Sequence, residues 1–155
     1  MIRGVMKHTI PMFLHTTHYN PPWNLDMKIT INNCIAQKRH RFARGFVYDP
    51  SNKDKKIAYK EIKEQFTGEP YTDALKITFI FNIKRPKSHW NKYSLKPSAP
   101  IYNTKRPDID NYVKFYMDCM NKVVYLDDSQ VIELSAKKIY NDKESFTEIV
   151  IWTKK

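Results

Sequence analysis

Carboxylates gather in one short part of the chain, in a pattern that suggests a shared cation. Asp108 and Asp110 stand two residues apart, and Asp127 and Asp128 follow after a segment of helical length. Where the chain is extended, the two side chains of the first pair project from the same side. Carboxylates at close range raise one another's pKa and destabilise a site unless a cation offsets their charge. We therefore expect a divalent cation among these acids.

A lysine beside the acids fits cleavage of a phosphodiester bond. Mg²⁺ binds oxygen ligands and uses only a few carboxylates together with water. A metal of this kind activates a water molecule and stabilises the leaving oxygen of a phosphodiester. Lys114 follows Asp110 by four residues and shares its face of a helix, from which it can orient or neutralise the scissile phosphate.

The same spacing leaves structural roles open for each acid. Asp108 or Asp110 can cap the start of a helix, because Asp is favoured at helix N-termini. The Asp-Asp pair at 127–128 can form a turn. Asp110, Lys114 and Asp118 can form a row of exposed ion pairs, which contributes little to stability.

The charge of the chain points to a polyanionic partner. Its 155 residues, enough for one domain, contain 27 Lys and Arg against 16 Asp and Glu, a net charge of +11. No acid lies between Asp26 and Asp49 or between Asp73 and Asp108, so basic side chains are segregated rather than spread for solubility alone. Lys and Arg that meet phosphates release counterions. The residues expected to contact DNA in these stretches are Lys38, Arg39, Arg41, Arg44, Arg85, Lys87, Lys105 and Arg106.

Composition excludes several other classes of site. With three glycines, the chain has no glycine-rich phosphate loop. Cys34 and Cys119 are its only cysteines, which argues against a cysteine metal cluster or disulfide framework and favours free thiols in a reducing compartment. His8, His15 and His18 match no common metal-site spacing. Without a membrane span or a signal-peptide plan, we expect a soluble intracellular protein, cytoplasmic or associated with DNA in the nucleoid, with no membrane partner.

Periodicity places the acids within one domain, residues 27–155, which follows an extension of residues 1–26. The basic, aromatic-rich segment 37–48 predicts a short hairpin that turns at Gly45, and residues 84–107 predict a long basic loop. Alternating apolar residues predict strands at 27–32, 74–83, 130–140 and 146–152, with the last two paired as a hairpin.

Two helices are predicted from apolar residues near helical spacing. The first covers 52–66 and turns Ile57, Ile62 and Phe66 inward. The second covers 109–121, directly after the first acidic pair, and its inner face is formed by Val113, Tyr116, Met117 and Met120.

The acids belong to a compound motif that resembles the RusA family of Holliday junction resolvases. The family pattern reads a basic residue, Asp, an apolar residue, Asp, Asn, two variable residues and Lys, and later Asp-Asp, a small residue, Gln, an apolar residue and a strand that bears a Lys. In this chain it reads Arg106-Pro107-Asp108-Ile109-Asp110-Asn111-Tyr112-Val113-Lys114, Asp118, Leu126-Asp127-Asp128-Ser129-Gln130-Val131 and Lys138. The resemblance covers residues 27–153 and is far more specific than Asp-x-Asp.

The resemblance implies a small α/β fold, a homodimer, dependence on Mg²⁺ or Mn²⁺, and cleavage of four-way DNA junctions. It assigns the catalytic carboxylates to Asp108, Asp110 and Asp128 and the essential lysine to Lys114. Asp127 matches a less critical acid, which we include among the expected metal ligands. Lys138 joins the expected DNA contacts, whereas the role of Asp118 stays open.

These observations together predict one α+β domain of RusA-like type, with a mixed or antiparallel sheet of about four strands and two main helices. The expected activity is Mg²⁺-dependent resolution of four-way junctions by paired symmetric nicks, in DNA recombination or repair. An endonuclease for other branched or flapped DNA, a catalytically silent DNA-binding protein and an RNA-directed nuclease stay open. Aromatic residues of the long loop that can stack on exposed bases are Trp90, Tyr93 and Tyr102.

Overall fold

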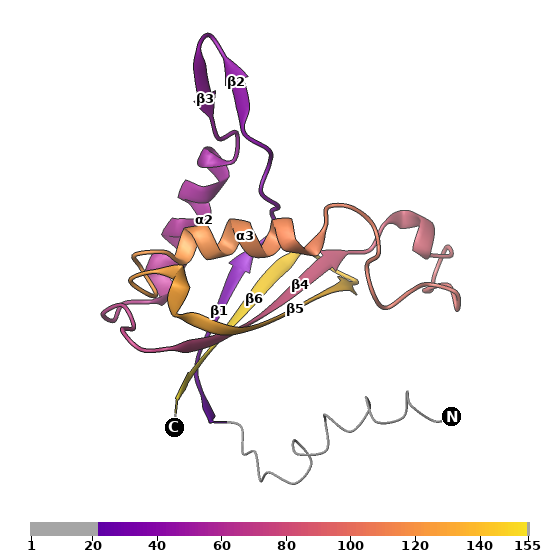
Figure 1. The fold of residues 1–155 in the computed structure, drawn as a ribbon. Helices are drawn as coiled ribbons and strands as arrows, with labels where there is room; N and C mark the ends of the chain where they lie inside the picture. The colour runs from indigo at the N-terminus through magenta and orange to yellow at the C-terminus, as the bar shows by residue number, and fades with distance from the viewer. Residues whose placement is uncertain (1–21, 155) are drawn as a thin grey trace, which may run out of the picture.

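The fold is a four-stranded mixed sheet with two helices packed on one face (Figure 1). The computed structural model describes residues 22–154. The strands lie in the order β1 (Trp23–Asn32), β6 (Phe146–Lys154), β4 (Leu75–Lys84) and β5 (Val131–Asn141). Strand β6 is antiparallel to both β1 and β4, whereas β4 and β5 are parallel. The predicted α+β domain with a mixed sheet of four strands and two main helices is confirmed.

The predicted hairpin between the last two strands is wrong, because β4 lies between β5 and β6. Strand β4 has the most apolar inner face: Leu75, Ile77, Phe79 and Phe81 are fully buried. A strand of this kind is most stable in the middle of a sheet, where both of its edges are paired and its inner face is covered. Strand β5 is left at the edge.

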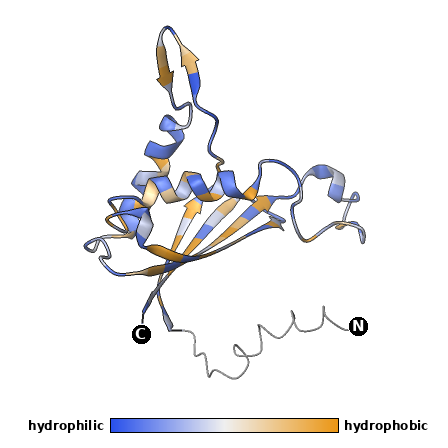
Figure 2. Ribbon diagram, viewed as in Figure 1, coloured by the Kyte–Doolittle hydropathy of each residue, from blue (hydrophilic) through white to orange (hydrophobic). Residues whose placement is uncertain are grey.

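Helices α2 (Asn52–Gln65) and α3 (Ile109–Met120) cover the apolar face of the sheet. Figure 2 shows how hydrophobic residues follow the strands beneath them. Helix α3 matches its predicted range within a residue. Its predicted inner residues Tyr116 and Met120 are fully buried, and Val113 and Met117 pack at the margin of the core. The prediction missed three further buried residues of α3, namely Tyr112, Phe115 and Cys119.

One predicted core residue of α2 is exposed. Ile57 points to solvent, whereas Ala58, Ile62 and Phe66 are buried. Ala58 and Ile62 lie four residues apart and therefore on one face of the helix. The small side chain of Ala58 lets this face of the helix approach the sheet. Ile57 therefore lies outside the contact between helix and sheet.

A separate two-stranded hairpin extends away from the body of the protein (Figure 1). It consists of β2 (Arg41–Ala43) and β3 (Phe46–Tyr48). Arg44 and Gly45 between them both have positive φ, 52° and 82°. Two positive φ values are typical of the two-residue turn that matches the twist of a hairpin. The predicted turn at Gly45 is confirmed.

The ends of the domain differ in detail from the prediction. Strand β1 begins at Trp23, before the predicted start of the domain at residue 27. The predicted extension of residues 1–26 stays a prediction, because residues 1–21, including the three histidines, lie outside the described residues. None of the helices in the described part has the length and hydrophobicity needed to cross a membrane.

The long basic loop before α3 is attached to the end of β5. It contains a short 3-10 helix, η2 (Lys87–His89). The backbone amide of Asn103 donates to the carbonyl of Lys138 at 3.0 Å, and that of Tyr140 donates to Ile101 at 2.8 Å. The loop therefore has a defined path, and this path fixes the position of Asp108 at the start of α3.

Candidate active site

The first acidic pair lies at the N-terminal end of α3 and has no side-chain partner among the described residues. Asp108 occupies the N-cap position with an extended backbone, but its side chain makes no capping hydrogen bond. Asp110 lies in the first turn. Neither carboxylate takes part in a salt bridge within residues 22–154. The helix dipole at this end favours negative charge. The capping role that the spacing left open therefore does not occupy these carboxylates.

The pair opens into a polar cleft of about 440 Å³. One wall comes from α3 and the other from the segment that leads into β2. Basic and imidazole side chains on the second wall face the carboxylates on the first. The lining residues are Gln37, Lys38, Arg39, His40, Asp108, Asp110, Asn111 and Lys114.

Lys114 shares the cleft with both carboxylates, as its spacing predicted. It forms no salt bridge with any other described residue. The possible row of ion pairs through Asp110, Lys114 and Asp118 is absent from the described residues, because Asp118 pairs instead with Lys55 at 3.0 Å. The ammonium of Lys114 is thus available to an anion in the cleft.

Asp128 lies at the opposite end of α3 from Asp108. It begins the short 3-10 helix η3 (Asp128–Gln130) just before β5. Burial, and next the nearby carboxylate of Asp128, raise the pKa of Tyr125, whose hydroxyl donates to the carbonyl of Met117 near the end of α3. Helix α3 has 12 residues and is therefore about 18 Å long.

The length of strand β5 shows independently that Asp128 lies far from Asp108. Lys138, ten residues after Asp128, donates its ammonium to the carbonyls of Lys105 and Pro107, next to Asp108. Each strand residue adds about 3.3 Å. One chain therefore does not bring Asp108, Asp110 and Asp128 together, and within residues 22–154 no three metal-ligating side chains cluster.

The turn that presents Asp128 is held by its neighbours Asp127 and Gln130. The carboxylate of Asp127 accepts hydrogen bonds from the hydroxyl and backbone amide of Ser129, which lower its pKa. The amide oxygen of Gln130 accepts from the backbone of Leu126 and Asp127, which completes a capping box. The role predicted for Asp127 as a metal ligand stays a prediction, and its carboxylate is engaged in this turn.

Gln130 also ties the turn to the segment before β4. Its amide nitrogen donates to the carbonyls of Tyr71 at 2.8 Å and Asp73 at 3.1 Å. Sequence reasoning missed this function, although an acid followed three residues later by Gln is the capping-box signal that indicates it. Gln130 is therefore a positioning residue for Asp128.

Two residues predicted to contact DNA make internal contacts. Lys138 holds the backbone just before Asp108, as described above. Arg85 has a side chain only 7% exposed, pairs with Asp142 at 2.7 Å and donates to the carbonyl of Pro100. Their predicted DNA contacts stay predictions, and the geometry favours a structural role for both.

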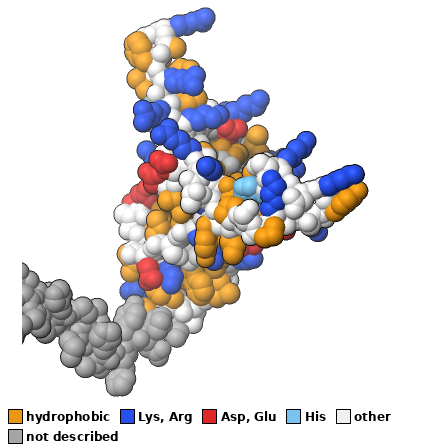
Figure 3. Space-filling view, turned by 90° about the vertical axis from the view of Figure 1, so that its right-hand side faces the viewer, with side chains coloured by type: hydrophobic (Ala, Val, Ile, Leu, Met, Phe, Trp, Pro, Cys, Tyr) orange, Lys and Arg blue, Asp and Glu red, His pale blue; other side chains and the backbone are white. Residues whose placement is uncertain are grey.

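The other predicted DNA contacts are exposed. Figure 3 shows Lys and Arg side chains along the projecting hairpin and on the face around it. The exposed residues are Lys38, Arg39, Arg41, Arg44, Lys87, Lys105 and Arg106. Of these, Lys38 also pairs with Asp54 at 3.3 Å.

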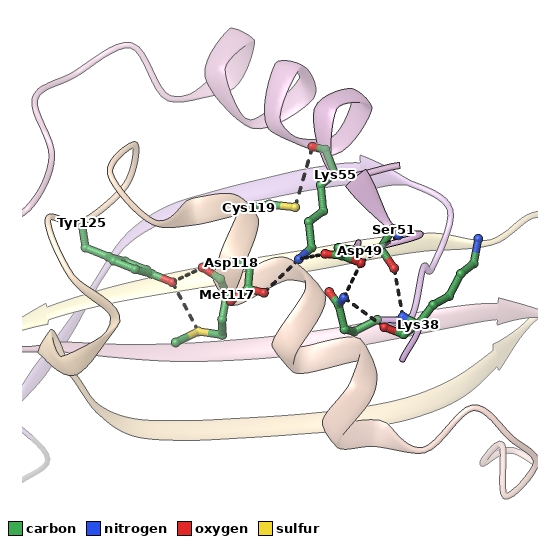
Figure 4. A network of polar contacts seen from close by, with 9 residues as sticks. Lys38, Asp49, Ser51, Lys55, Met117, Asp118, Cys119 and Tyr125 are labelled. Atoms are coloured by element: carbon green, nitrogen blue, oxygen red, sulfur yellow. Dashed lines mark hydrogen bonds and ion pairs between the residues drawn. The ribbon is translucent and has the colours of Figure 1, made fainter. Parts of the chain in front are cut away.

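A partly buried polar network connects the base of the hairpin to both helices (Figure 4). The ammonium of Lys55 lies 2.8 Å from Asp49 and 3.0 Å from Asp118. Asp49 also accepts from the backbone of Ser51 and from the side chain of Gln37. Burial alone would raise the pKa of Asp49, but the hydrogen bonds from Lys55, Ser51 and Gln37 hold it well below the ordinary value.

This network gives Asp118 a place in the fold. Through Lys55 it joins α3 to α2 and to Asp49 at the base of the hairpin. Two hydrogen bonds from backbone amides add to it. The amide of Gln37 donates to the carbonyl of Asn111 at 2.9 Å, and the amide of Lys38 donates to the hydroxyl of Ser51 at 2.9 Å. The network thus fixes the basic wall of the cleft against the acidic wall.

Replacing Lys55 with Met is expected to lower the free energy of unfolding by about 1–3 kcal/mol, because two carboxylates lose their cation. Urea unfolding followed by circular dichroism measures this loss. The matched control is Lys60→Met, which removes an exposed pair of α2 with Glu64 at 4.0 Å and should cost less than about 0.5 kcal/mol. Equal unfolding midpoints for the two variants would contradict the role of the network.

The same pair of variants has a defined pH dependence. Asp49 has a lowered pKa, so its stabilising contribution is present above the ordinary Asp value of 3.8 and is lost as the pH falls below it. The difference in stability between wild type and Lys55→Met should therefore shrink on acidification.

Comparison with known proteins decides the family. The family described as "Endodeoxyribonuclease RusA" matches residues 32–152, most of the chain and all of the cleft. The chain belongs to the RusA family. The resemblance stated from the motif is thereby confirmed.

Two relatives of this RusA-family chain have similar sequences over shorter segments. A Lactococcus phage r1t protein named crossover junction endodeoxyribonuclease rusA is 40% identical over 78 residues, which is 50% of this chain and 51% of the relative. An uncharacterized Bacillus subtilis (strain 168) protein, YqaN, is 39% identical over 64 residues, 41% of each chain. The chain thus spans about half the length of the curated relatives that it matches, or less.

Proposed function

We propose that this RusA-family protein is a divalent-metal-dependent endonuclease that cuts four-way DNA junctions by paired symmetric nicks. One observation carries the proposal: two carboxylates without protein partners in the described chain share a basic-walled cleft with Lys114. Family membership and the name of the phage relative support it. Its place would be in DNA recombination or repair, inside the cell, in the cytoplasm or associated with DNA in the nucleoid.

The donor set at the start of α3 fits a hard cation such as Mg²⁺ or Mn²⁺. Asp108 and Asp110 offer carboxylate oxygens, and Mg²⁺ needs only one or two carboxylates with water and substrate phosphate. When bound, the metal supplies an activated water and stabilises the leaving oxygen. Lys114 would neutralise charge on the scissile phosphate. Lys38 and Arg39 on the facing wall would hold the adjacent backbone phosphates.

The position of Asp128 supports a homodimer. A single chain keeps Asp128 at the far end of α3, so the predicted three-aspartate set needs a second copy. A four-way junction has approximate two-fold symmetry, and a two-fold dimer presents two identical sites to it. We propose that the partner subunit's Asp128 completes the site formed by Asp108 and Asp110 of the first chain.

The surface next to Asp128 suits such a contact. Strand β5 is an edge strand; the loop before α3 pairs with its far end, at Lys138 and Tyr140, whereas the backbone of its first half, next to Asp128, can meet a second strand. Ile132 is 61% and Leu134 47% exposed on it, and Leu126 is exposed in the preceding turn. Exposed apolar side chains on an edge strand are what an interface with a second copy would cover.

The proposed activity predicts metal-dependent cutting of a four-way junction, with little cutting of linear duplex of the same sequence. The assay compares junction, flap, duplex and single strand, each with Mg²⁺, with Mn²⁺ and with chelator. Comparable cutting of flaps would favour the broader branched-DNA endonuclease. Equal cutting of linear duplex would contradict the structure-specific reading, and binding without any cutting would leave a silent DNA-binding protein.

A further inference from the structure

The β2–β3 hairpin presents hydrophobic side chains that the described fold leaves uncovered on both faces. Its register pairs Phe42 with Val47 on one face and Ala43 with Phe46 on the other. Phe42 is 73%, Phe46 75% and Val47 70% exposed. None of them belongs to the hydrophobic core. An isolated two-stranded hairpin is marginally stable, and exposed rings do not strengthen it. The rings are therefore placed for a partner outside this domain.

The chemistry around the rings indicates the kind of partner. Arg41 and Arg44 lie within the hairpin itself, and Arg39 and His40 lead into it. No acid lies between Asp26 and Asp49. Aromatic rings interleaved with arginine form stacking platforms for nucleic acid bases, since every base has an apolar face and an adjacent phosphate. A paired duplex buries those faces within its own stack, whereas bases at a branch point are accessible.

The position of the hairpin connects it to the cleft. Its base, from Gln37 to His40, is the basic wall that faces Asp108 and Asp110. The bond from Gln37 to Asn111 and the Lys55 network hold this base in place. From His40 to the turn at Arg44, an extended chain reaches roughly 13 Å. The tip of the hairpin can therefore contact DNA a few nucleotides away from the phosphate next to the acidic pair.

We propose that the hairpin inserts Phe42 and Phe46 against unstacked bases at the centre of a DNA branch, so that the adjoining phosphodiester lies in the cleft. The hairpin would then select branched over linear DNA, with one ring on each face to meet bases on two sides. The proposal rests on the proposed function and names the part of the chain that recognises the branch.

The test replaces both rings in the full-length protein, Phe42→Ala with Phe46→Ala. A four-way junction carries 2-aminopurine at its centre or, in a second substrate, within an arm, and Ca²⁺ in place of Mg²⁺ limits cutting. Wild type should change the fluorescence of the central probe but leave the probe in the arm unchanged. The double variant should lose that change and bind the junction about 10-fold to 100-fold more weakly, with unaltered affinity for linear duplex.

Two control variants separate stacking from general contact. Phe42→Tyr with Phe46→Tyr keeps both rings and should retain the fluorescence change. Val47→Thr removes an apolar group of similar exposure without a ring and should bind as wild type. Equal thermal unfolding of all variants is expected, because these side chains lie outside the core.

The outcomes distinguish this proposal from the proposed function. A wild-type protein that neither prefers nor cuts junctions would contradict the proposed function itself. A wild type that cuts junctions, with a double variant that binds and unstacks them equally well, would overturn only the role of the hairpin. Loss of dimer mass in sedimentation of the double variant would show instead that the rings join two copies of the chain.

Discussion

Replacing Asp108 with Asn is expected to reduce junction cleavage about 1,000-fold or more and to leave junction binding intact or tighter. The amide keeps the size of the side chain but loses the charge that holds a cation, and metal stabilisation of the transition state is worth several kcal/mol. Binding should not weaken, because a negative group facing DNA phosphates is removed. Single-turnover cleavage in Mg²⁺ and gel-shift binding in Ca²⁺ measure the two effects.

A second acid of α3 provides the control for this substitution. Asp118→Asn alters a carboxylate of the same helix that lies outside the cleft and pairs with Lys55. It should lower stability and slow junction cutting far less than Asp108→Asn does, because it removes no group that lines the cleft. If Asp108→Asn nicks junctions at the wild-type rate, the cleft is not the site of cleavage.

Mixed dimers of Asp108→Asn and Asp128→Asn are expected to nick junctions, although each variant alone does not. If a site combines Asp108 of one chain with Asp128 of the other, a mixed dimer has one site with both substitutions and one site with neither. Dimers isolated through two different tags should therefore show about half the wild-type nicking rate. Their products should be mainly single nicks, because only one of the two sites is intact.

The corresponding control joins Asp108→Asn with Asp110→Asn. Both residues lie in the cleft of the same chain, so each site in this mixed dimer carries one substitution and should stay inactive. Recovery of nicking in this control would contradict a site shared between two chains. The absence of nicking in the mixed dimer of Asp108→Asn with Asp128→Asn would contradict it too. A protein that sediments as a monomer on junction DNA would contradict it as well.

Local patterns in the sequence predicted the elements but not how they meet. The range of α3, part of its inner face and the strand at β4 followed from periodicity, because burial imposes a regular spacing. The pairing of β5 with β4 could not be predicted in this way. The short connection between β5 and β6 favours a hairpin, and that hairpin is lost only because β4 takes the central position between them. Ile57 shows the same limit at one residue, since spacing alone does not set how a helix is rotated about its axis.

The acids show what a motif in the sequence leaves undetermined. Asp108, Asp110 and Lys114 share a cleft because all three lie at the start of one helix, at spacings of two and four residues. Asp128 follows α3 in the sequence, and the chain length alone does not show that the helix leads away from the cleft. The Lys55 network was likewise invisible, because its members come from three separate elements.

Strand β5 sets the spacing between Asp108 and Asp128 within one chain. Asp128 precedes its first residue, and Lys138 near its other end grips the backbone that leads to Asp108. A paired strand resists stretching, so the separation between the two acids is a fixed length rather than the average of a flexible linker. In a two-fold dimer that length would also determine how far apart the two nicks fall, which links the geometry of one edge strand to whether the cut ends can be rejoined.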